Sequence, residues 1–263
     1  MLRSFLRRLR RAPGRSSVRI ALCEDRVFVS TGEAITLARD EAAPAWRAAI
    51  DSLPGILSSH AATEANIVLA DQFCRYALLP WSDTLKTHAQ WMALARHRFC
   101  AIHGPVANDW EIKFAETAPA GPRLACAVDA GLVDALAERF SGGSVHLVSV
   151  LPFLVTAFNQ IRHRTGGSCW LVVEEPGRLT LALFLRGVWA AIRSRRGDAS
   201  PQAWRAALPE MIARENALLG LEEPCTRVIV CAQGAFSEGE LATSDEDFRL
   251  DTFPYQELAL AGN

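Results

Sequence analysis

The chain contains few residues whose types and spacing could perform catalysis. A Walker phosphate-binding loop places a lysine directly after a glycine, but the two lysines, Lys86 and Lys113, follow leucine and isoleucine. No two glycines have the G-x-G spacing of a dinucleotide-binding fingerprint, and the G-x-S-x-G sequence of a nucleophile elbow does not occur. The sequence therefore excludes these three common ways of binding phosphate, binding a dinucleotide or transferring an acyl group.

One cluster has the residue types that bind zinc. His97, Cys100 and His103 are close along the chain, and Cys74 offers a further thiol if the fold brings it near. A structural zinc site has four ligands at recurring short spacings, and here the fourth ligand is not fixed by spacing. The pattern favours the end of a helix with one buried thiol and two surface imidazoles. We expect no metal site.

Two adjacent carboxylates, Glu174 and Glu175, fall in a predicted strand. Successive side chains of a strand point to opposite faces, so these two cannot act together as acid and base. None of the six histidines has a spacing that indicates catalysis. We therefore predict no catalytic residue and interpret the chain as a protein other than an enzyme.

The composition indicates a folded protein of the cytoplasm. Half of the 263 residues are hydrophobic, which is enough for the core of one large or two modest domains. The formal net charge of −1 argues against a nucleic-acid partner. The seven cysteines include no C-x-x-C pair and lie mostly in apolar runs, which is typical of buried free thiols rather than of a disulfide framework.

The first 15 residues combine apolar and basic side chains, with Leu2, Phe5, Leu6 and Leu9 among five closely spaced arginines. They could form a short amphipathic helix that binds the inner-membrane surface or the acidic tail of a membrane partner. The alternative is a solvated, frayed terminus. Neither here nor elsewhere does the chain offer the ~20 consecutive apolar residues of a membrane span.

Apolar alternation and turn residues predict the elements that surround these motifs. In the first part, Glu24-Asp25 is expected to form the turn of a hairpin and Pro44 to begin a helix. The expected elements are strands at 18–23, 26–30 and 33–37, a helix at about 44–57, a helix at about 83–99 and a strand at 110–115.

The stretch from 123 to 194 is the most regular. Asp129 can cap a helix after a short apolar strand, and Pro152 suits the first turn of another helix. The expected elements are a strand at 124–128, a helix that ends before Gly142, a strand at 145–150, a helix from Pro152, and strands at 169–174, 178–185 and 188–194. We interpret the first strand, helix and second strand as a parallel βαβ unit.

The last part repeats the beginning. A helix that ends near Leu219 follows the three strands, as one follows the first three strands, and this repeated order indicates an internal duplication. Pro209 is expected to break this helix into two pieces. A strand at 227–232, an acidic loop at 238–247 and a short strand at 248–250 complete the prediction.

In the order of its elements and in its short motifs, the chain resembles one branch of the actin-like proteins. This branch contains the PilM and GspL proteins of type IV pilus and type II secretion platforms. The resemblance covers about 17–235. The segments that carry it are Leu124–Asp129, Gly143–Val150, Leu151-Pro152-Phe153-Leu154 and Ile67–Leu79 followed by Pro80-Trp81-Ser82. It implies an α/β fold made of two duplicated halves with mixed sheets.

The resemblance also implies a division of the chain. Residues 1–16 would form a basic tail, 17–165 the first half, 166–236 the second half, and 237–263 an acidic loop and C-terminal tail. A small subdomain at about 82–120 would be inserted in the first half.

Actin-like ATPases hold phosphate with two hairpins that each open with Asp-x-Gly. The first hairpin here, Cys23-Glu24-Asp25-Arg26, has no glycine, and in the second, Glu175-Pro176-Gly177, the proline removes a donor N–H. The glycine pair that holds adenosine in the family is reduced to Gln233-Gly234. We therefore expect no cofactor and no binding of ATP.

The resemblance implies a non-catalytic scaffold, a pseudo-ATPase at the cytoplasmic side of the inner membrane. Its partner would be the cytoplasmic tail of a bitopic, PilN-like protein, bound by the first half beside the edge formed by 67–79. Arg26 and Arg75 could pair with acidic residues of that tail, or they could simply be solvated. The alternatives are an actin-like ATPase or sugar-kinase-type enzyme with divergent phosphate loops, and an adaptor unrelated to pili.

Overall fold

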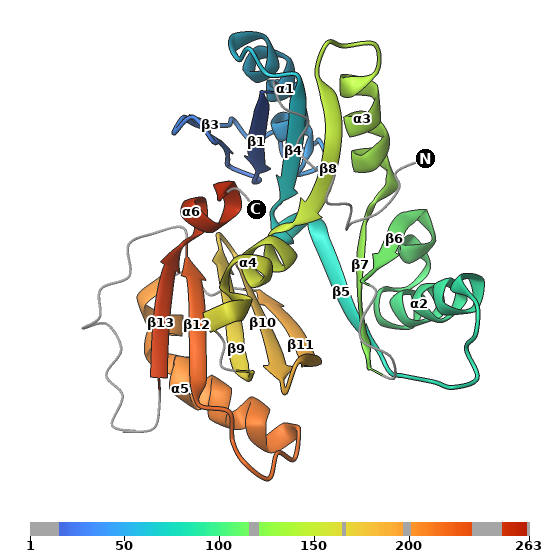
Figure 1. Ribbon diagram of the computed structural model, residues 1–263, viewed down its shortest axis with the longest axis vertical. Coiled ribbons are helices and arrows are strands. Elements are labelled where there is room, and N and C mark those ends of the chain that lie inside the picture. Colours follow the sequence, from blue (N-terminus) through green and yellow to red (C-terminus); the bar gives the residue numbers. More distant parts are fainter. Residues whose placement is uncertain (1–15, 116–120, 165–166, 197–200, 233–248, 262–263) are drawn as a thin grey trace.

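The computed structural model describes residues 16–115, 121–164, 167–196, 201–232 and 249–261. It contains two five-stranded sheets and a smaller third sheet (Figure 1). The first sheet has the order β3-β2-β1-β4-β8. Its strands are β1 (Ser17–Leu22), β2 (Arg26–Val29), β3 (Ala34–Thr36), β4 (Glu64–Leu69) and β8 (His146–Pro152).

The second sheet repeats this arrangement with the order β11-β10-β9-β12-β13. Its strands are β9 (Cys169–Glu175), β10 (Arg178–Leu185), β11 (Val188–Arg196), β12 (Arg227–Ala232) and β13 (Arg249–Pro254). In both sheets the first three strands are antiparallel, and two further strands continue in parallel beside the first. The duplicated α/β fold predicted from the sequence is thus confirmed.

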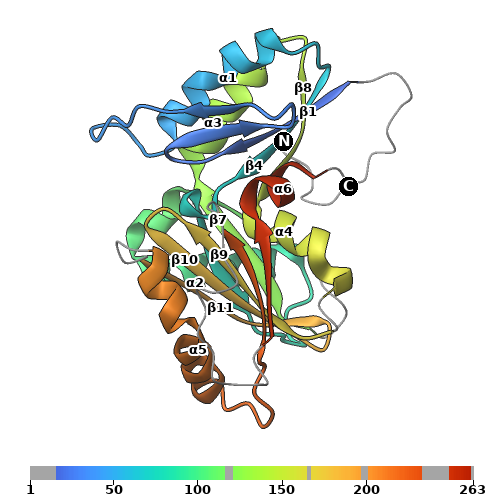
Figure 2. The ribbon, with the colours of Figure 1, turned by 90° about the vertical axis from the view of Figure 1, so that its left-hand side faces the viewer.

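Helices cover the outer face of each sheet. α1 (Arg47–Ser59) and α3 (Ala130–Phe140) pack against each other beside the first sheet, and α5 (Pro201–Leu218) lies along the second sheet (Figure 2). As predicted, Asp129 caps α3, because its carboxylate accepts the N–H of Gly131 over 2.8 Å.

Two helices cross between the halves. α4 (Phe153–Ile161) follows β8 of the first half, yet its Phe158 packs against Phe184 and Trp189 of the second sheet. α6 (Tyr255–Leu260) follows β13 of the second half, yet it packs against β1 and β2. Tyr255 and Phe153 stack with ring centroids 3.7 Å apart, so the two crossing helices meet at the junction (Figure 1).

The third sheet is antiparallel, with the order β5-β7-β6 and its own small core. It consists of β5 (Cys74–Leu79), β7 (Arg123–Asp129) and β6 (Trp110–Phe114), with α2 (His88–His103) packed on one face. The short helices η1 (Asp71–Phe73), η2 (Pro105–Asp109) and η3 (Arg162–Arg164) connect neighbouring elements. Of these, η1 links β4 of the first sheet to β5 of the third.

Three sequence-based expectations are wrong. β7 and β8 belong to different sheets and form no parallel βαβ unit, because β8 pairs with β4. α5 runs unbroken through Pro209, since its buried Trp204, Leu208 and Ile212 hold it against the second sheet on both sides of the proline. α2 begins at His88 rather than near Asp83, because Thr87 and Gln90 form a capping box there.

Other expectations fall outside the described residues. These are the basic segment 1–15, the acidic loop 238–247 and the Gln233-Gly234 pair. Among the described residues, no helix combines the length and the apolar character needed to cross a membrane.

Candidate functional site

The ends of the two predicted phosphate hairpins meet at the junction of the halves. Cys23 directly follows β1, at the start of the first hairpin, and Glu175 is the last residue of β9, at the start of the second hairpin. The hydroxyl of Tyr255 on α6 bridges them: it donates to Oε1 of Glu175 over 3.0 Å and lies 3.7 Å from the Sγ of Cys23. Glu175 and Tyr255 are buried, so this contact is closed to solvent.

Glu175 also binds the backbone of the first half. Its two carboxylate oxygens accept the N–H groups of Asp71 and Gln72 over 2.8 and 2.7 Å. These amides open η1, where backbone N–H groups have no partner within the helix and attract an anion. The side-chain amide of Gln72 donates in turn to the carbonyl of Pro176. These hydrogen bonds hold the second hairpin against the segment between β4 and β5.

Asp71 forms the other half of this buried cluster. Its Oδ1 accepts the hydroxyl of Tyr76 and the backbone N–H of Leu154, while its Oδ2 has no partner. Burial raises the pKa of Asp71 to about 6. Burial and the nearby charge of Asp71 together raise the pKa of Glu175 to about 8. The pair therefore holds at least one proton near neutral pH.

This geometry binds the halves together through buried carboxyl groups. The carboxylates of Asp71 and Glu175 are both enclosed, and the donors that a phosphate could use at η1 already bind Glu175. Glu174 lies on the opposite face of β9, as predicted, where it accepts hydrogen bonds from Trp204 and Arg205. The two glutamates thus serve two separate contacts.

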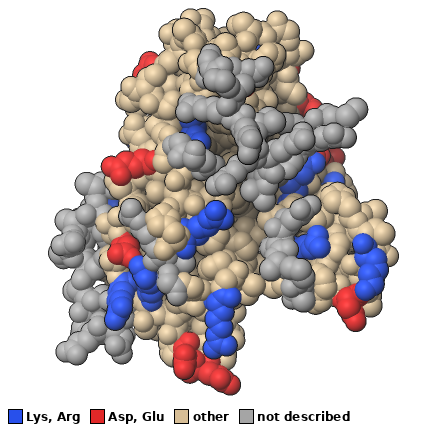
Figure 3. Space-filling view, in the orientation of Figure 1, with Lys and Arg blue, Asp and Glu red and all other residues tan. Residues whose placement is uncertain are grey.

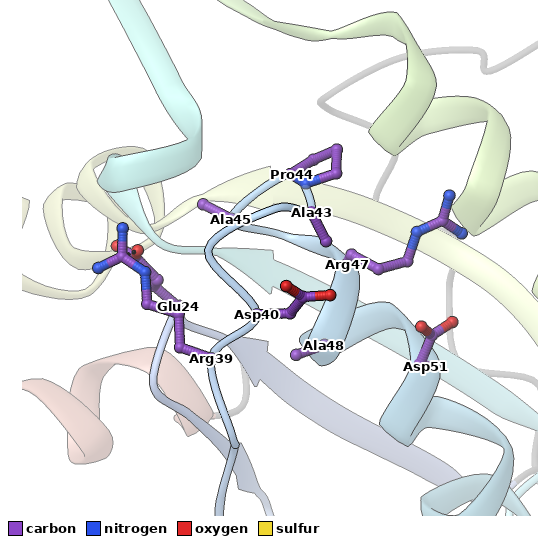
Figure 4. Close-up of a pocket in the computed structure, with 9 residues that line it drawn as sticks. All are labelled: Glu24, Arg39, Asp40, Ala43, Pro44, Ala45, Arg47, Ala48 and Asp51. Atoms are coloured by element: carbon purple, nitrogen blue, oxygen red, sulfur yellow. Dashed lines mark ion pairs between the residues drawn. The ribbon is translucent and has the colours of Figure 1, made fainter.

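A shallow pocket of about 160 Å³ lies on the first half, between the first hairpin and the start of α1 (Figure 4). Its charges are largely satisfied within the protein. Arg39 pairs with Glu24 over 3.1 Å, Asp51 with Arg139 over 2.7 Å, and Asp40 accepts a backbone N–H. Arg47 also lines the pocket, and its guanidinium lies over the ring of Trp46, 5.1 Å from the ring centroid.

The predicted partner-binding residues, Arg26 and Arg75, lie in different sheets and are not brought together. Arg26 on β2 pairs with its neighbour Asp25 over 2.6 Å and is about half exposed, at 42%. Arg75 on β5 donates from Nη1 to the carbonyls of Gln72 and Cys74 over 3.0 and 2.9 Å. Both side chains remain partly accessible at the surface of the first half.

The expectation of a sheet edge holds for only one of the two strands in 67–79. β4 is an interior strand between β1 and β8, whereas β5 is an edge strand of the third sheet. The outer side of β5 approaches β11 of the second half. β11 therefore lies close to the space that a peptide strand added to β5 would need.

The residues that were considered as zinc ligands and judged not to form a site have other contacts. Cys100 lies 3.4 Å from the side-chain oxygen of Asn108, and His103 packs edge-on against Trp110 with ring centroids 5.0 Å apart. Cys74 is buried in β5. In the described part of the chain, no three His, Cys, Asp or Glu side chains are arranged to hold a metal ion.

Sequence reasoning missed Asp71, Tyr255 and the contact role of Glu175. Asp71 gave one signal, since it is an acidic residue that directly follows the apolar run Ile67–Ala70. Its partner Glu175 lies 104 positions further along the chain. No local pattern could have joined these residues, because only the assembled junction brings them together.

Figure 3 shows how charge is distributed over one face of the molecule. Lys and Arg side chains form separate groups over both halves and the third sheet, and acidic side chains lie mostly toward the outline of this view. Recognition of a charged partner on this face would therefore depend on local clusters rather than on one continuous basic patch.

No family model and no curated protein matches this sequence. Solved structures with the same fold do match, each at 12% sequence identity. A structure of the PilM–PilN type IV pilus biogenesis complex is similar over 92% of this chain and 89% of the other, with a TM-score of 0.63.

Two further structures are similar with a TM-score of 0.57. The cytoplasmic domain of EpsL, an inner-membrane component of the type II secretion system of Vibrio cholerae, matches over 93% of this chain and 92% of the other. A Bacteroides thetaiotaomicron protein with an actin-like ATPase fold and unknown function matches over 91% of both chains. The fold is therefore actin-like, and the resemblance found in the sequence is confirmed for the fold.

Proposed function

We propose that this protein is a non-catalytic, cytoplasmic scaffold of a type IV pilus or type II secretion platform, peripheral at the inner membrane. The observation that carries the proposal is the similarity to the PilM–PilN complex along nearly the whole of both chains. The similarity to the cytoplasmic domain of an inner-membrane secretion component supports the same setting.

The proposed absence of catalysis rests on the junction. In an actin-like ATPase the nucleotide would lie between the halves, next to the two hairpins. Here Glu175, Tyr255 and Phe153 are buried at that place, and neither hairpin opens with Asp-x-Gly. A pseudo-ATPase that uses the two halves as a rigid frame fits these residues better than an enzyme does.

The proposed partner is the cytoplasmic tail of a bitopic, PilN-like inner-membrane protein, bound on the first half beside Arg26 and Arg75. The ion pair of Arg26 with Asp25 is half exposed and stabilises the fold little, so Arg26 can turn to an acidic residue of the tail. Residues 1–15 would add contact with the membrane surface.

The test is direct binding of a synthetic peptide with the sequence of that tail, taken from a PilN-like protein of the same genome, measured by calorimetry. We expect binding to the wild-type protein and about tenfold weaker binding to the Arg75→Glu variant, which reverses a charge at the proposed surface. Glu223→Arg, at an exposed position of the second half, is the control. Absence of binding to the wild-type protein would contradict the proposal.

A further inference from the structure

Two arginines at the junction of the halves form no ion pair with any described residue, although the positive charge of Arg178 acts on the buried Asp71 and partly offsets the rise in its pKa. The Nη1 atoms of Arg75 and Arg178 both donate to the carbonyl oxygen of Gln72, over 3.0 and 3.2 Å. Guanidinium groups that share one acceptor atom lie side by side and repel each other. Among the described residues, no carboxylate forms an ion pair with either arginine.

Two more basic side chains lie close to this pair. Arg196 on β11 is directly opposite Arg178 in the antiparallel ladder, so both side chains emerge on the same face of the second sheet. His103, the last residue of α2, approaches from the first half. Its partial burial, and then the positive charges of Arg75 and Arg178, lower its pKa. Positive charge from both halves therefore meets at this point.

Several arginines elsewhere in the second half have acidic partners. Arg193 and Arg195 lie on the other face of β11 and both bind Glu215. Arg205 binds Glu174 over 3.1 Å. The contrast is informative, because like charges placed opposite each other in a sheet destabilise it unless an anion lies between them. The arrangement of Arg75, Arg178 and Arg196 is therefore typical of a site that binds an anionic group of another molecule.

The surroundings indicate which kind of anion. Ile102 and Val106 lie at the same end of α2 as His103, and each is 54% exposed, which is unusual for side chains of this size. A site for a small free anion is usually an enclosed hollow. Here the side chains of Arg75 and Arg178 are partly exposed, and two apolar side chains at the end of α2 are exposed as well, so the arrangement suits a peptide that carries both acidic and apolar residues.

We propose that Arg75 and Arg178 together bind a carboxylate side chain of an acidic peptide segment, with Arg196 adding positive charge and Ile102 and Val106 receiving a neighbouring apolar side chain. The inference deepens the proposed function and rests on it, since the peptide is a segment of the partner's tail. It adds a contact on the second half. The partner would then bridge both halves and favour the relative position seen here.

The experiment measures fluorescence anisotropy of two labelled peptides, hexaglutamate and the tail of the PilN-like protein. The Arg178→Gln variant removes one guanidinium, and Arg39→Gln removes the same charge from an exposed arginine that is already paired with Glu24. We expect both peptides to bind Arg178→Gln about tenfold more weakly than wild type and Arg39→Gln nearly as well as wild type. Arg75→Gln repeats the test from the first half, and thermal melts establish that each variant is folded.

The outcomes separate the two proposals. If the tail binds wild type and Arg178→Gln equally well, the site is refuted while the proposed function stands. If hexaglutamate binding depends on Arg178 and the tail does not bind at all, the acidic-peptide site stands and the proposed partner is wrong. If Arg178→Gln and Arg39→Gln weaken binding to the same extent, the attraction is general electrostatics, and the inference is overturned.

Discussion

Glu175 shows how one buried carboxyl can make stability depend on pH. Its folded pKa of about 8 lies above the ordinary value of 4.5 because burial and Asp71 disfavour its charged form. An acid whose pKa is raised by folding stabilises the folded state fully below its unfolded pKa. That contribution is lost as the pH rises through the folded pKa. The contribution of Glu175 therefore declines between about pH 4.5 and pH 8.

We expect the Glu175→Gln variant to differ most from wild type in acid. The amide keeps one acceptor but loses the second for the N–H groups of Asp71 and Gln72, which costs about 1–3 kcal/mol. The amide does not titrate, so the difference should shrink as the pH rises from about 5 to about 9. Urea unfolding across this range measures it, with Glu33→Gln at an exposed position as the control. A difference that grows with pH would show that Glu175 is stabilising as the ion.

The limits of sequence reasoning at the residue scale follow from the same cluster. Asp129 was recognisable as a helix cap because its signal is local, two residues from the N–H that it accepts. Arg178 has no such signal, since its significance depends on Gln72 and Arg75 in the other half. Residues whose roles arise from contacts between distant segments could not be identified from one sequence.

Strands and their order were predictable because alternation of apolar residues is a local signal. β9, β10 and β11 lie within a few residues of the expected ranges. Which strands pair with each other could not be predicted in this way, because strand pairing depends on packing between distant parts of the chain. α3 therefore connects β7 and β8 across two sheets although the sequence favoured one parallel unit.

At the scale of elements, α6 is expected to hold the halves together through Tyr255. Tyr255→Phe keeps the stack on Phe153 and removes the hydroxyl that binds Glu175, so we expect a loss of about 1–2 kcal/mol. Tyr255→Ala also removes the buried ring and should cost about 3–5 kcal/mol. Leu218→Ala, at an exposed position of α5, should change stability little. Chemical unfolding of the three variants checks this order, and equal losses for Phe and Ala would show that the ring contributes nothing.

For the molecule as a whole, the buried contacts between the halves and the residues of the two hairpins predict that ATP does not bind. Glu175 and Tyr255 are buried where the halves meet. The first hairpin has Arg26 and no glycine, and in the second hairpin Pro176 removes a donor N–H. Calorimetry and thermal melts with millimolar Mg-ATP should show neither heat of binding nor stabilisation. A clear rise in melting temperature would instead favour an ATPase with divergent loops.

We expect the basic segment 1–15 to bind the membrane and to contribute nothing to the stability of the fold. Its apolar and arginine side chains could hold the protein at an anionic membrane. The first strand of the first sheet begins after this segment, at Ser17. We expect deletion of 1–15 to leave the cooperative melt unchanged and to weaken binding to vesicles that contain phosphatidylglycerol. Sedimentation with these vesicles measures the effect, and neutral phosphatidylcholine vesicles are the control. A truncated protein that no longer melts cooperatively would mean that the segment belongs to the core, and unchanged sedimentation would mean that the membrane contact lies elsewhere.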